Sequence, residues 1–244
     1  MLRSDPARPR ITCYDDSDPS TGGERVELSA KVLANWVAKA GNLLQDEWDV
    51  TSGSVVYLDL PAHWRTAYWA LATWSVGAAV ALGDLSEEDA VGVGVADRVG
   101  ELGPADALLT TRPQLAGSGG PVGVVTLAAL ARRATPPVPA GVLDEAAELA
   151  TFPDVFDPWA VPSSSEVAMQ VGSQAMTYAA LLDEVSSPAD GRGPRIHLVA
   201  PEVATFLVTS LRTWAADGSV VLSTRPLSDQ ARARREAAEG ATPA

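Results

Sequence analysis

Residues 54–82 read SVVYLDLPAHWRTAYWALATWSVGAAVAL, and they predict a strand, a helix and a second strand in that order. The first apolar run ends at Pro61, the middle run has apolar residues at helical spacing, and the short run AAVAL follows Gly77. Two short buried strands joined by a helix are typical of a parallel sheet with a right-handed crossover. This stretch therefore predicts an α/β fold.

Residues 194–223, PRIHLVAPEVATFLVTSLRTWAADGSVVLS, repeat this pattern. The alignment matches prolines, leucines, threonines, tryptophans and, with a slip of one residue, glycines: Pro61 with Pro201, Leu71 with Leu211, Thr73 with Thr213, Trp74 with Trp214 and Gly77 with Gly218. Residues at the same helical phase face the same part of a core. We therefore expect both tryptophans to be buried in two similar strand-helix-strand units.

The predicted fold class is a layered α/β fold with a parallel sheet and two pseudo-repeated units. The sequence divides into an N-terminal extension, a first α/β unit, a Pro/Ser-rich crossing, a second α/β unit and a charged tail: 1–24, 25–134, 135–165, 166–225 and 226–244. The tail lacks apolar periodicity, so we expect a solvated or frayed helix there, or disorder.

Composition excludes several classes of protein. A chain of 244 residues with 46% hydrophobic residues can build a sizeable core, and its net charge of -13 argues against nucleic acid and anionic membranes as partners. Cys13 is a single cysteine, and the first ten residues lack the apolar region of a signal peptide, so we expect a cytoplasmic protein. The uncharged stretch Thr66–Gly83 predicts a buried helix and strand, not a membrane span, because Gly77 divides it.

These segments resemble the opening part of the adenylate-forming superfamily, the AMP-binding acyl-CoA synthetases and their relatives. GSVVYLDLPA and VGAAVAL stand where that family has G-D-x-V-x-x-x-L-P-N and A-G-A-x-x-V-P-L, and the second repeat resembles a later stretch ending in L-A-G-A-x-V-V-L. The resemblance points to a short actinobacterial branch. It implies the fold of the N-terminal subdomains, and it would imply ATP, magnesium and CoA only if the family's activity were retained.

The chain departs from that family at the phosphate loop. Between the segments EVAMQ and MTYAALL the family has a Gly, Ser and Thr-rich loop with a lysine, but here VGSQA contains one glycine, Gly172, and one serine, Ser173. A phosphate cradle needs several inward-facing amides and a cation, so VGSQA predicts a tight strand-to-helix turn. We also expect the family's later magnesium, ribose and catalytic-lysine motifs to be missing. The interpretation that we favour is a degenerate relative that is not an enzyme, with no catalytic residue, metal or cofactor.

Five residues are the candidates for binding a ligand: His63, Trp64, Gly172, Ser173 and Glu202. His63 follows the proline that ends the first predicted strand, at the sheet edge where open α/β folds bind ligands. A surface or helix-capping role is the alternative for this histidine.

Three other features have simpler interpretations. In GVGVADRVG (92–100), Asp97 stands where the third glycine of a dinucleotide motif belongs, so a buried strand is favoured. The acidic run DLSEEDA (84–90) is expected to be a solvated loop and not a cation site. His197 lies inside a predicted strand and is expected to be a hydrogen-bonded core or edge residue.

Two classes of function remain. One is a non-catalytic module that binds a protein partner or regulates, for which we expect a homo-oligomer or a complex with a protein partner. The other is a binding protein or an enzyme that takes an acyl, aryl or nucleotide ligand in a remodelled cleft between the two pseudo-repeated units. A filled cleft favours the first class and an open apolar pocket favours the second.

Overall fold

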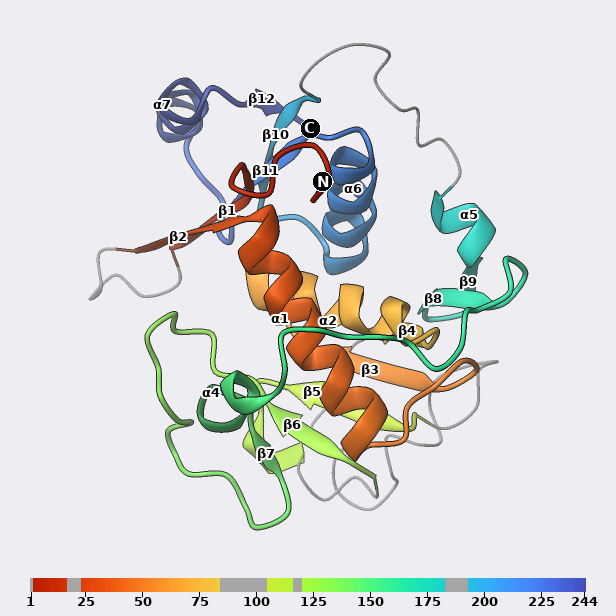
Figure 1. Cartoon of the computed structure of the whole chain (residues 1–244). Coiled ribbons are helices and arrows are strands. Elements are labelled where there is room, and N and C mark those ends of the chain that lie inside the picture. The colour runs from red at the N-terminus through yellow and green to blue at the C-terminus, as the bar shows by residue number, and fades with distance from the viewer. Residues whose placement is uncertain (1, 17–22, 84–104, 116–119, 183–192) are drawn as a thin grey trace. The chain divides into compact units, whose positions relative to one another are not determined.

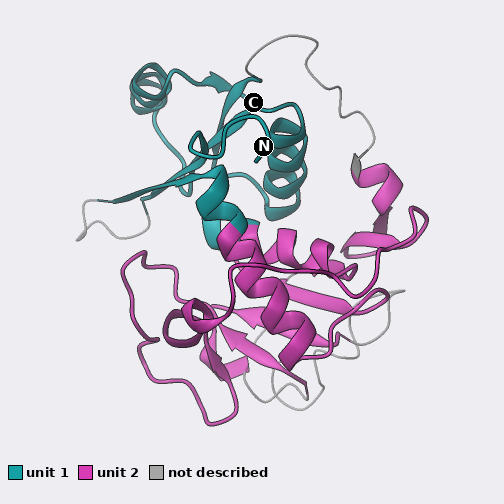
Figure 2. Cartoon of the chain, viewed as in Figure 1, with its two compact units in different colours: residues 1–34, 61–67, 182–244 teal, residues 35–60, 68–181 magenta. Residues whose placement is uncertain are grey.

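The computed structural model describes residues 2–16, 23–83, 105–115, 120–182 and 193–244. The chain forms two compact units, and Figure 2 shows them in different colours. Unit 1 contains residues 1–34, 61–67 and 182–244, and unit 2 contains residues 35–60 and 68–181. This division differs from the sequence-based one, because unit 1 combines both ends of the chain. Among the described residues, each unit contains one β-sheet.

The sheet of unit 1 has the strand order β12-β10-β11-β1-β2 (Figure 1). These strands are β1 (Pro9–Asp15), β2 (Glu24–Ser29), β10 (Arg195–Val199), β11 (Ser219–Ser223) and β12 (Thr242–Pro243). The pairs β10–β11, β1–β11 and β10–β12 are parallel, whereas β1–β2 is antiparallel. Helix α6 (Val203–Ala215) joins β10 to β11 and buries Phe206 and Trp214.

The sheet of unit 2 has the order β7-β6-β5-β3-β4-β8-β9. Its strands are β3 (Val55–Asp59), β4 (Ala79–Leu82), β5 (Ala107–Thr110), β6 (Val122–Val124), β7 (Leu143–Asp144), β8 (Val167–Val171) and β9 (Gln174–Thr177). All neighbouring strands are parallel except β8 and β9. Strands β4, β5 and β6 are buried along their whole length, as interior parallel strands should be.

The described residues also form helical segments. They are α1 (Ala30–Asn42), the π-helical turn η2 (Leu43–Glu47), α2 (Trp64–Ser75), η5 (Pro113–Leu115), α4 (Glu145–Glu148), η6 (Leu149–Thr151), α5 (Tyr178–Leu182) and α7 (Asp229–Glu239). The boundary between the two units falls within two helices, after Ala34 in α1 and after Ala67 in α2. No helix within the described residues is long and apolar enough to cross a membrane.

The two strand-helix-strand units are confirmed. Strands β3 and β4 are parallel neighbours joined by α2, and β10 and β11 are parallel neighbours joined by α6. Trp74 and Trp214 are 9% and 3% exposed, as expected from their matching helical phase. The sequence pattern therefore predicted the parallel strand-helix-strand crossover at the centre of each sheet.

The sequence alignment of Gly77 with Gly218 is wrong. The residue with positive φ after each helix is Gly77 (φ 88°) in α2 and Asp217 (φ 56°) in α6. Their amides donate to the backbone oxygens of Trp74 and Trp214 at 3.1 and 3.0 Å, which is the same helix ending in both units. Asp217 is therefore the counterpart of Gly77, and Gly218 occupies the place of Ala78.

Residues 226–244 were expected to form a solvated or frayed helix or to be disordered, and the structure has a helix, α7. Ser228 caps α7 by accepting from the amide of Ala231, and Gly240 ends the helix in the left-handed conformation. No residue of α7 is fully buried, yet Glu239 pairs with Arg25 and Arg195 of the sheet. The charged residues of this tail thus serve as anchors. The two motifs at residues 84–90 and 92–100 lie outside the described residues.

Candidate functional site

The position of the expected phosphate loop is a β-hairpin. Val171 of β8 lies opposite Gln174 of β9, so Gly172 and Ser173 form the two-residue turn between the strands. Gly172 has φ 55°, which is the left-handed conformation that such a turn requires. The predicted tight turn is present, but the expected strand-to-helix connection is wrong, because β9 precedes α5.

The polar groups of Gly172 are used within the protein. Its amide donates to the backbone oxygen of Leu82 at 3.4 Å, and its carbonyl accepts from the side-chain amide of Gln170 at 2.9 Å. A phosphate nest needs consecutive amides that converge on one anion. The Gly172 amide instead points at the neighbouring strand, so this turn offers a poor cradle for phosphate.

His63 is buried and caps a helix. It is 2% exposed, and its Nδ1 accepts from the backbone amide of Arg65 at 3.3 Å. Burial lowers the pKa of His63 to about 4. The imidazole is therefore neutral at pH 7 with its proton on Nε2, and the capping alternative agrees with its geometry.

Trp64 and Glu202 have different environments within unit 1. Trp64 is 4% exposed, and the guanidinium of Arg65 lies over its ring at 4.4 Å from the centroid. This packing is a cation–π contact in a buried place. Glu202 is exposed at the N-terminus of α6, and its side chain makes no capping hydrogen bond. His63, Trp64 and Glu202 belong to unit 1, whereas Gly172 and Ser173 belong to unit 2.

The remaining titratable candidates are structural. Burial raises the pKa of the Cys13 thiol to about 12, so this residue is a poor nucleophile. His197 contacts the hydroxyl of Ser223 at 2.8 Å through Nε2 and a carboxylate oxygen of Glu236 at 3.2 Å through Nδ1, as expected for a satisfied core histidine. The described part of the chain contains no group of three or more His, Cys, Asp or Glu side chains that could hold a metal ion.

Unit 2 has a cavity of about 370 Å³ beside the end of η2. Its accessible lining is mainly polar and includes the carboxylates of Glu47 and Glu148, and Leu43, Trp48 and Phe152 also border it. The volume is near the lower limit for pockets that bind small molecules. Two carboxylates would repel fatty acids, nucleotides and CoA, so the cavity suits a neutral or cationic group.

A surface segment that the sequence did not single out is held along α1 (Figure 1). We call residues 150–161 the clamped segment, because three helical side chains at intervals of three residues bind its backbone. Lys39 Nζ donates to the carbonyls of Ala150, at 2.8 Å, and of Phe152. Asn42 Nδ2 donates to the carbonyls of Pro153 and Val155, both at 2.9 Å.

Gln45 holds the far end of the clamped segment. Its Nε2 donates to the carbonyl of Asp157 at 3.3 Å, and its Oε1 accepts from the amide of Trp159 at 2.9 Å. Phe156 packs against the same helix, because a Cβ atom at Gly41 would lie 3.1 Å from its ring. These contacts fix the path of a segment that has no regular secondary structure after η6.

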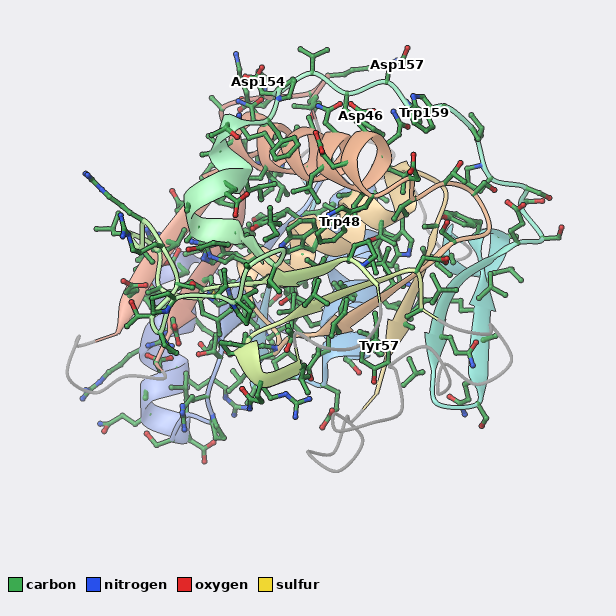
Figure 3. All side chains as sticks on the ribbon, turned by 90° about the horizontal axis from the view of Figure 1, so that it is seen from below. Asp46, Trp48, Tyr57, Asp154, Asp157 and Trp159 are labelled. Atoms are coloured by element: carbon green, nitrogen blue, oxygen red, sulfur yellow. The ribbon has the colours of Figure 1, made fainter. Side chains whose placement is uncertain are left out.

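The exposed side chains of the clamped segment include apolar and acidic ones. Val155, Trp159 and Val161 are 78%, 64% and 85% exposed. Figure 3 shows Asp154, Asp157 and Trp159 pointing outward from the segment. The signal that could have revealed the clamp is the polar series Lys39, Asn42 and Gln45, each side chain one helical turn from the next.

Comparisons with known proteins agree with this architecture. An acyl-CoA synthetase from Brucella canis has a TM-score of 0.70 at 19% identity, over 98% of this chain and 44% of that chain. The N-terminal subdomain of NpsA from Klebsiella oxytoca, in complex with 3-hydroxybenzoyl-AMSN, has a TM-score of 0.66 at 13% identity, over 99% of this chain and 56% of that chain. The fold is that of the N-terminal part of adenylate-forming enzymes. A benzoate CoA ligase from Burkholderia xenovorans LB400 also has a TM-score of 0.66, at 13% identity, over 96% of this chain and 46% of that chain.

One curated protein is similar in sequence to this chain. A TIGR03089 family protein from Mycobacterium tuberculosis (strain ATCC 25618 / H37Rv) is 43% identical over 158 residues, which are 65% of this chain and 59% of the relative. No protein-family model matches the chain. The chain thus spans less than two thirds of this relative and about half the length of the solved structures. The expected relationship is confirmed for the fold.

Proposed function

We propose that this chain is a degenerate adenylate-forming-like domain that does not transfer adenylate and instead serves as a binding module. The observation that carries the proposal is the amide of Gly172, which donates to Leu82 at the place of the expected phosphate loop. The five residues VGSQA supply one glycine and no lysine. Losing one preorganised donor typically slows a reaction by roughly 100- to 1,000-fold.

The charge of the chain supports the same proposal. A net charge of -13 opposes the approach of a tetra-anion such as ATP, and VGSQA has no cation to offset it. Ser173 is exposed at the hairpin turn, so its hydroxyl has no buried surroundings to strengthen an interaction with phosphate. Pyrophosphate exchange should therefore stay at background.

The test is pyrophosphate exchange with a panel of acyl and aryl acids, with an active acyl-CoA synthetase as the positive control. Ser173→Ala is the matched variant, because Ser173 is exposed and its replacement should leave the fold unchanged. We expect background exchange from both forms. Exchange well above background that disappears in Ser173→Ala would contradict the proposal.

The second candidate is a small-molecule binder, and the cavity of about 370 Å³ favours it. A thermal-shift screen separates the ligand classes, since a ligand that binds only the folded state raises the melting temperature. Glu47 and Glu148 predict no shift with fatty acids, nucleotides or CoA through this cavity. Binding of such anions elsewhere in the chain stays a prediction, and a concentration-dependent shift with one of them would favour it.

A further inference from the structure

We propose that the clamped segment, residues 150–161, is a docking surface for a basic segment of a partner protein that also carries apolar side chains. The inference rests on the proposed function, because it names what the binding module would bind. Three properties of the segment carry it: a fixed backbone, exposed apolar side chains and a one-signed charge.

The backbone of the segment is fixed before any partner arrives. Lys39, Asn42 and Gln45 each make two hydrogen bonds to it, and Asn42 and Gln45 are only 7% and 4% exposed. The buried amide side chains of Asn42 and Gln45 therefore hold a segment that has no regular secondary structure. Preorganisation lowers the entropy lost on binding, which is how a rigid surface gains affinity.

The clamped segment exposes three apolar side chains. Val155, Trp159 and Val161 lie within seven positions of the chain, and each is more than half exposed. Single exposed apolar residues are normal, but a group on one rigid segment marks an interaction site. Tryptophan is among the residues that contribute most to binding energy in interfaces. Trp159 is therefore the expected anchor.

The charge selects a basic partner. Asp154 and Asp157 alternate with the apolar side chains, and Asp46 follows Gln45, the residue that holds both Asp157 and Trp159 (Figure 3). The ammonium of Lys39 is already directed at two backbone carbonyls of the segment. Opposite potentials across an interface favour association, so arginine and lysine side chains match these carboxylates.

The cavity continues this surface at the start of the clamped segment. Phe152 belongs to the segment and lines the cavity, whose carboxylates come from Glu47 and Glu148. A cavity of about 370 Å³ with a mainly polar lining and two carboxylates suits the charged end of one cationic side chain of the bound segment. A second copy of this chain is a poorer occupant, because two chains of charge -13 repel each other.

The experiment is calorimetric titration of the full chain with a synthetic peptide of alternating arginine and leucine. The same peptide with glutamate in place of arginine is the probe control. We expect saturable binding of the arginine peptide only. Trp159→Ala should weaken it about tenfold or more, and Trp159→Phe should restore part of the affinity. Trp159 is largely exposed, so both variants should keep the melting temperature of the parent chain.

A second pair of variants separates a specific site from general charge attraction. Asp154→Asn with Asp157→Asn should weaken binding and flatten its salt dependence. Asp5→Asn with Asp229→Asn changes the net charge equally at exposed positions of unit 1, and it should leave binding nearly unchanged. Equal weakening by the two pairs, or no effect of Trp159→Ala, would overturn the proposal.

Two further outcomes are decisive. If the chain dimerises in sedimentation and Trp159→Ala dissociates the dimer, the occupant is a second copy and the proposal of a basic partner fails. Pyrophosphate exchange measured on the same preparation keeps the two proposals apart. Background exchange with no peptide binding refutes only the docking surface, whereas exchange above background refutes the proposed function.

Discussion

Trp214 donates its indole N–H to the backbone oxygen of Arg10 at 2.8 Å. In the other unit, Trp74 donates in the same way to the backbone oxygen of Ala168 at 2.7 Å. Arg10 lies in β1 beside β11, and Ala168 lies in β8 beside β4. Each tryptophan therefore reaches from the crossover helix to the strand next to the one that follows it, and the pseudo-repeat extends to a third strand.

The first prediction concerns these two tryptophans. Trp74→Phe and Trp214→Phe each remove the donor to a carbonyl, so each should lower the free energy of unfolding by about 1–3 kcal/mol. Trp159→Phe is the control, and its effect should stay within about 0.5 kcal/mol because this side chain is largely exposed. Urea unfolding measures all three. Equal effects from the three variants would show that the two hydrogen bonds contribute nothing.

The second prediction concerns acid stability. Burial raises the pKa of Glu239, but hydrogen bonds from Arg25, Tyr14 and Arg195 outweigh it and lower the pKa to about 2. A carboxyl group with a lowered pKa stabilises the fold fully above its ordinary value of about 4.5. This stability should disappear as the pH falls from about 4.5 to about 2. Urea unfolding at several pH values should show a shallower loss for Glu239→Gln, and an unchanged slope would contradict the assignment.

The third prediction concerns His63. Its pKa is lowered to about 4 by burial, so the neutral form stabilises the fold fully above the ordinary value of about 6.5. That contribution should be lost as the pH falls from about 6.5 towards 4. An NMR titration of the ring protons should give a midpoint near 4. A midpoint near 6.5 would mean that the imidazole is exposed to water.

The fourth prediction concerns the clamp. The amide of Trp159 donates to Gln45 Oε1, so Gln45→Ala should increase the hydrogen-exchange rate of this amide. Lys31→Ala is the matched control on α1, because Lys31 is exposed. It should leave the exchange rate unchanged. If both variants behave alike, Gln45 does not hold the segment.

The sequence predicted the elements that have a strong period. The run Val55–Leu82 carries apolar residues at helix and strand spacing, and its strand, helix and strand are present. Strand β9 was missed because the residues Gly172 and Ser173 fit a strand-to-helix turn as well as the turn of a β-hairpin. Edge strands such as β12, with two residues, are too short to have a detectable pattern.

The candidate site was harder to predict because its contacts are distant in sequence. Gln45 binds the backbone of Asp157, 112 residues away, and no local pattern indicates such a pair. The burial of His63 also depends on the packed unit around it and not on its neighbours in sequence. By contrast, the lack of a lysine in VGSQA is directly visible, and it supports the proposed function without a structure.

The most direct test of that proposal is an NMR titration of the amides of Gly172 and Ser173 with magnesium-ATP. We predict no saturable change in either amide signal, because the Gly172 amide already donates to Leu82 and the chain carries a net charge of -13. Saturable shifts confined to these two amides, and absent when the same volume of nucleotide-free magnesium buffer is added, would contradict the proposal. They would mean that the hairpin turn is a working phosphate site.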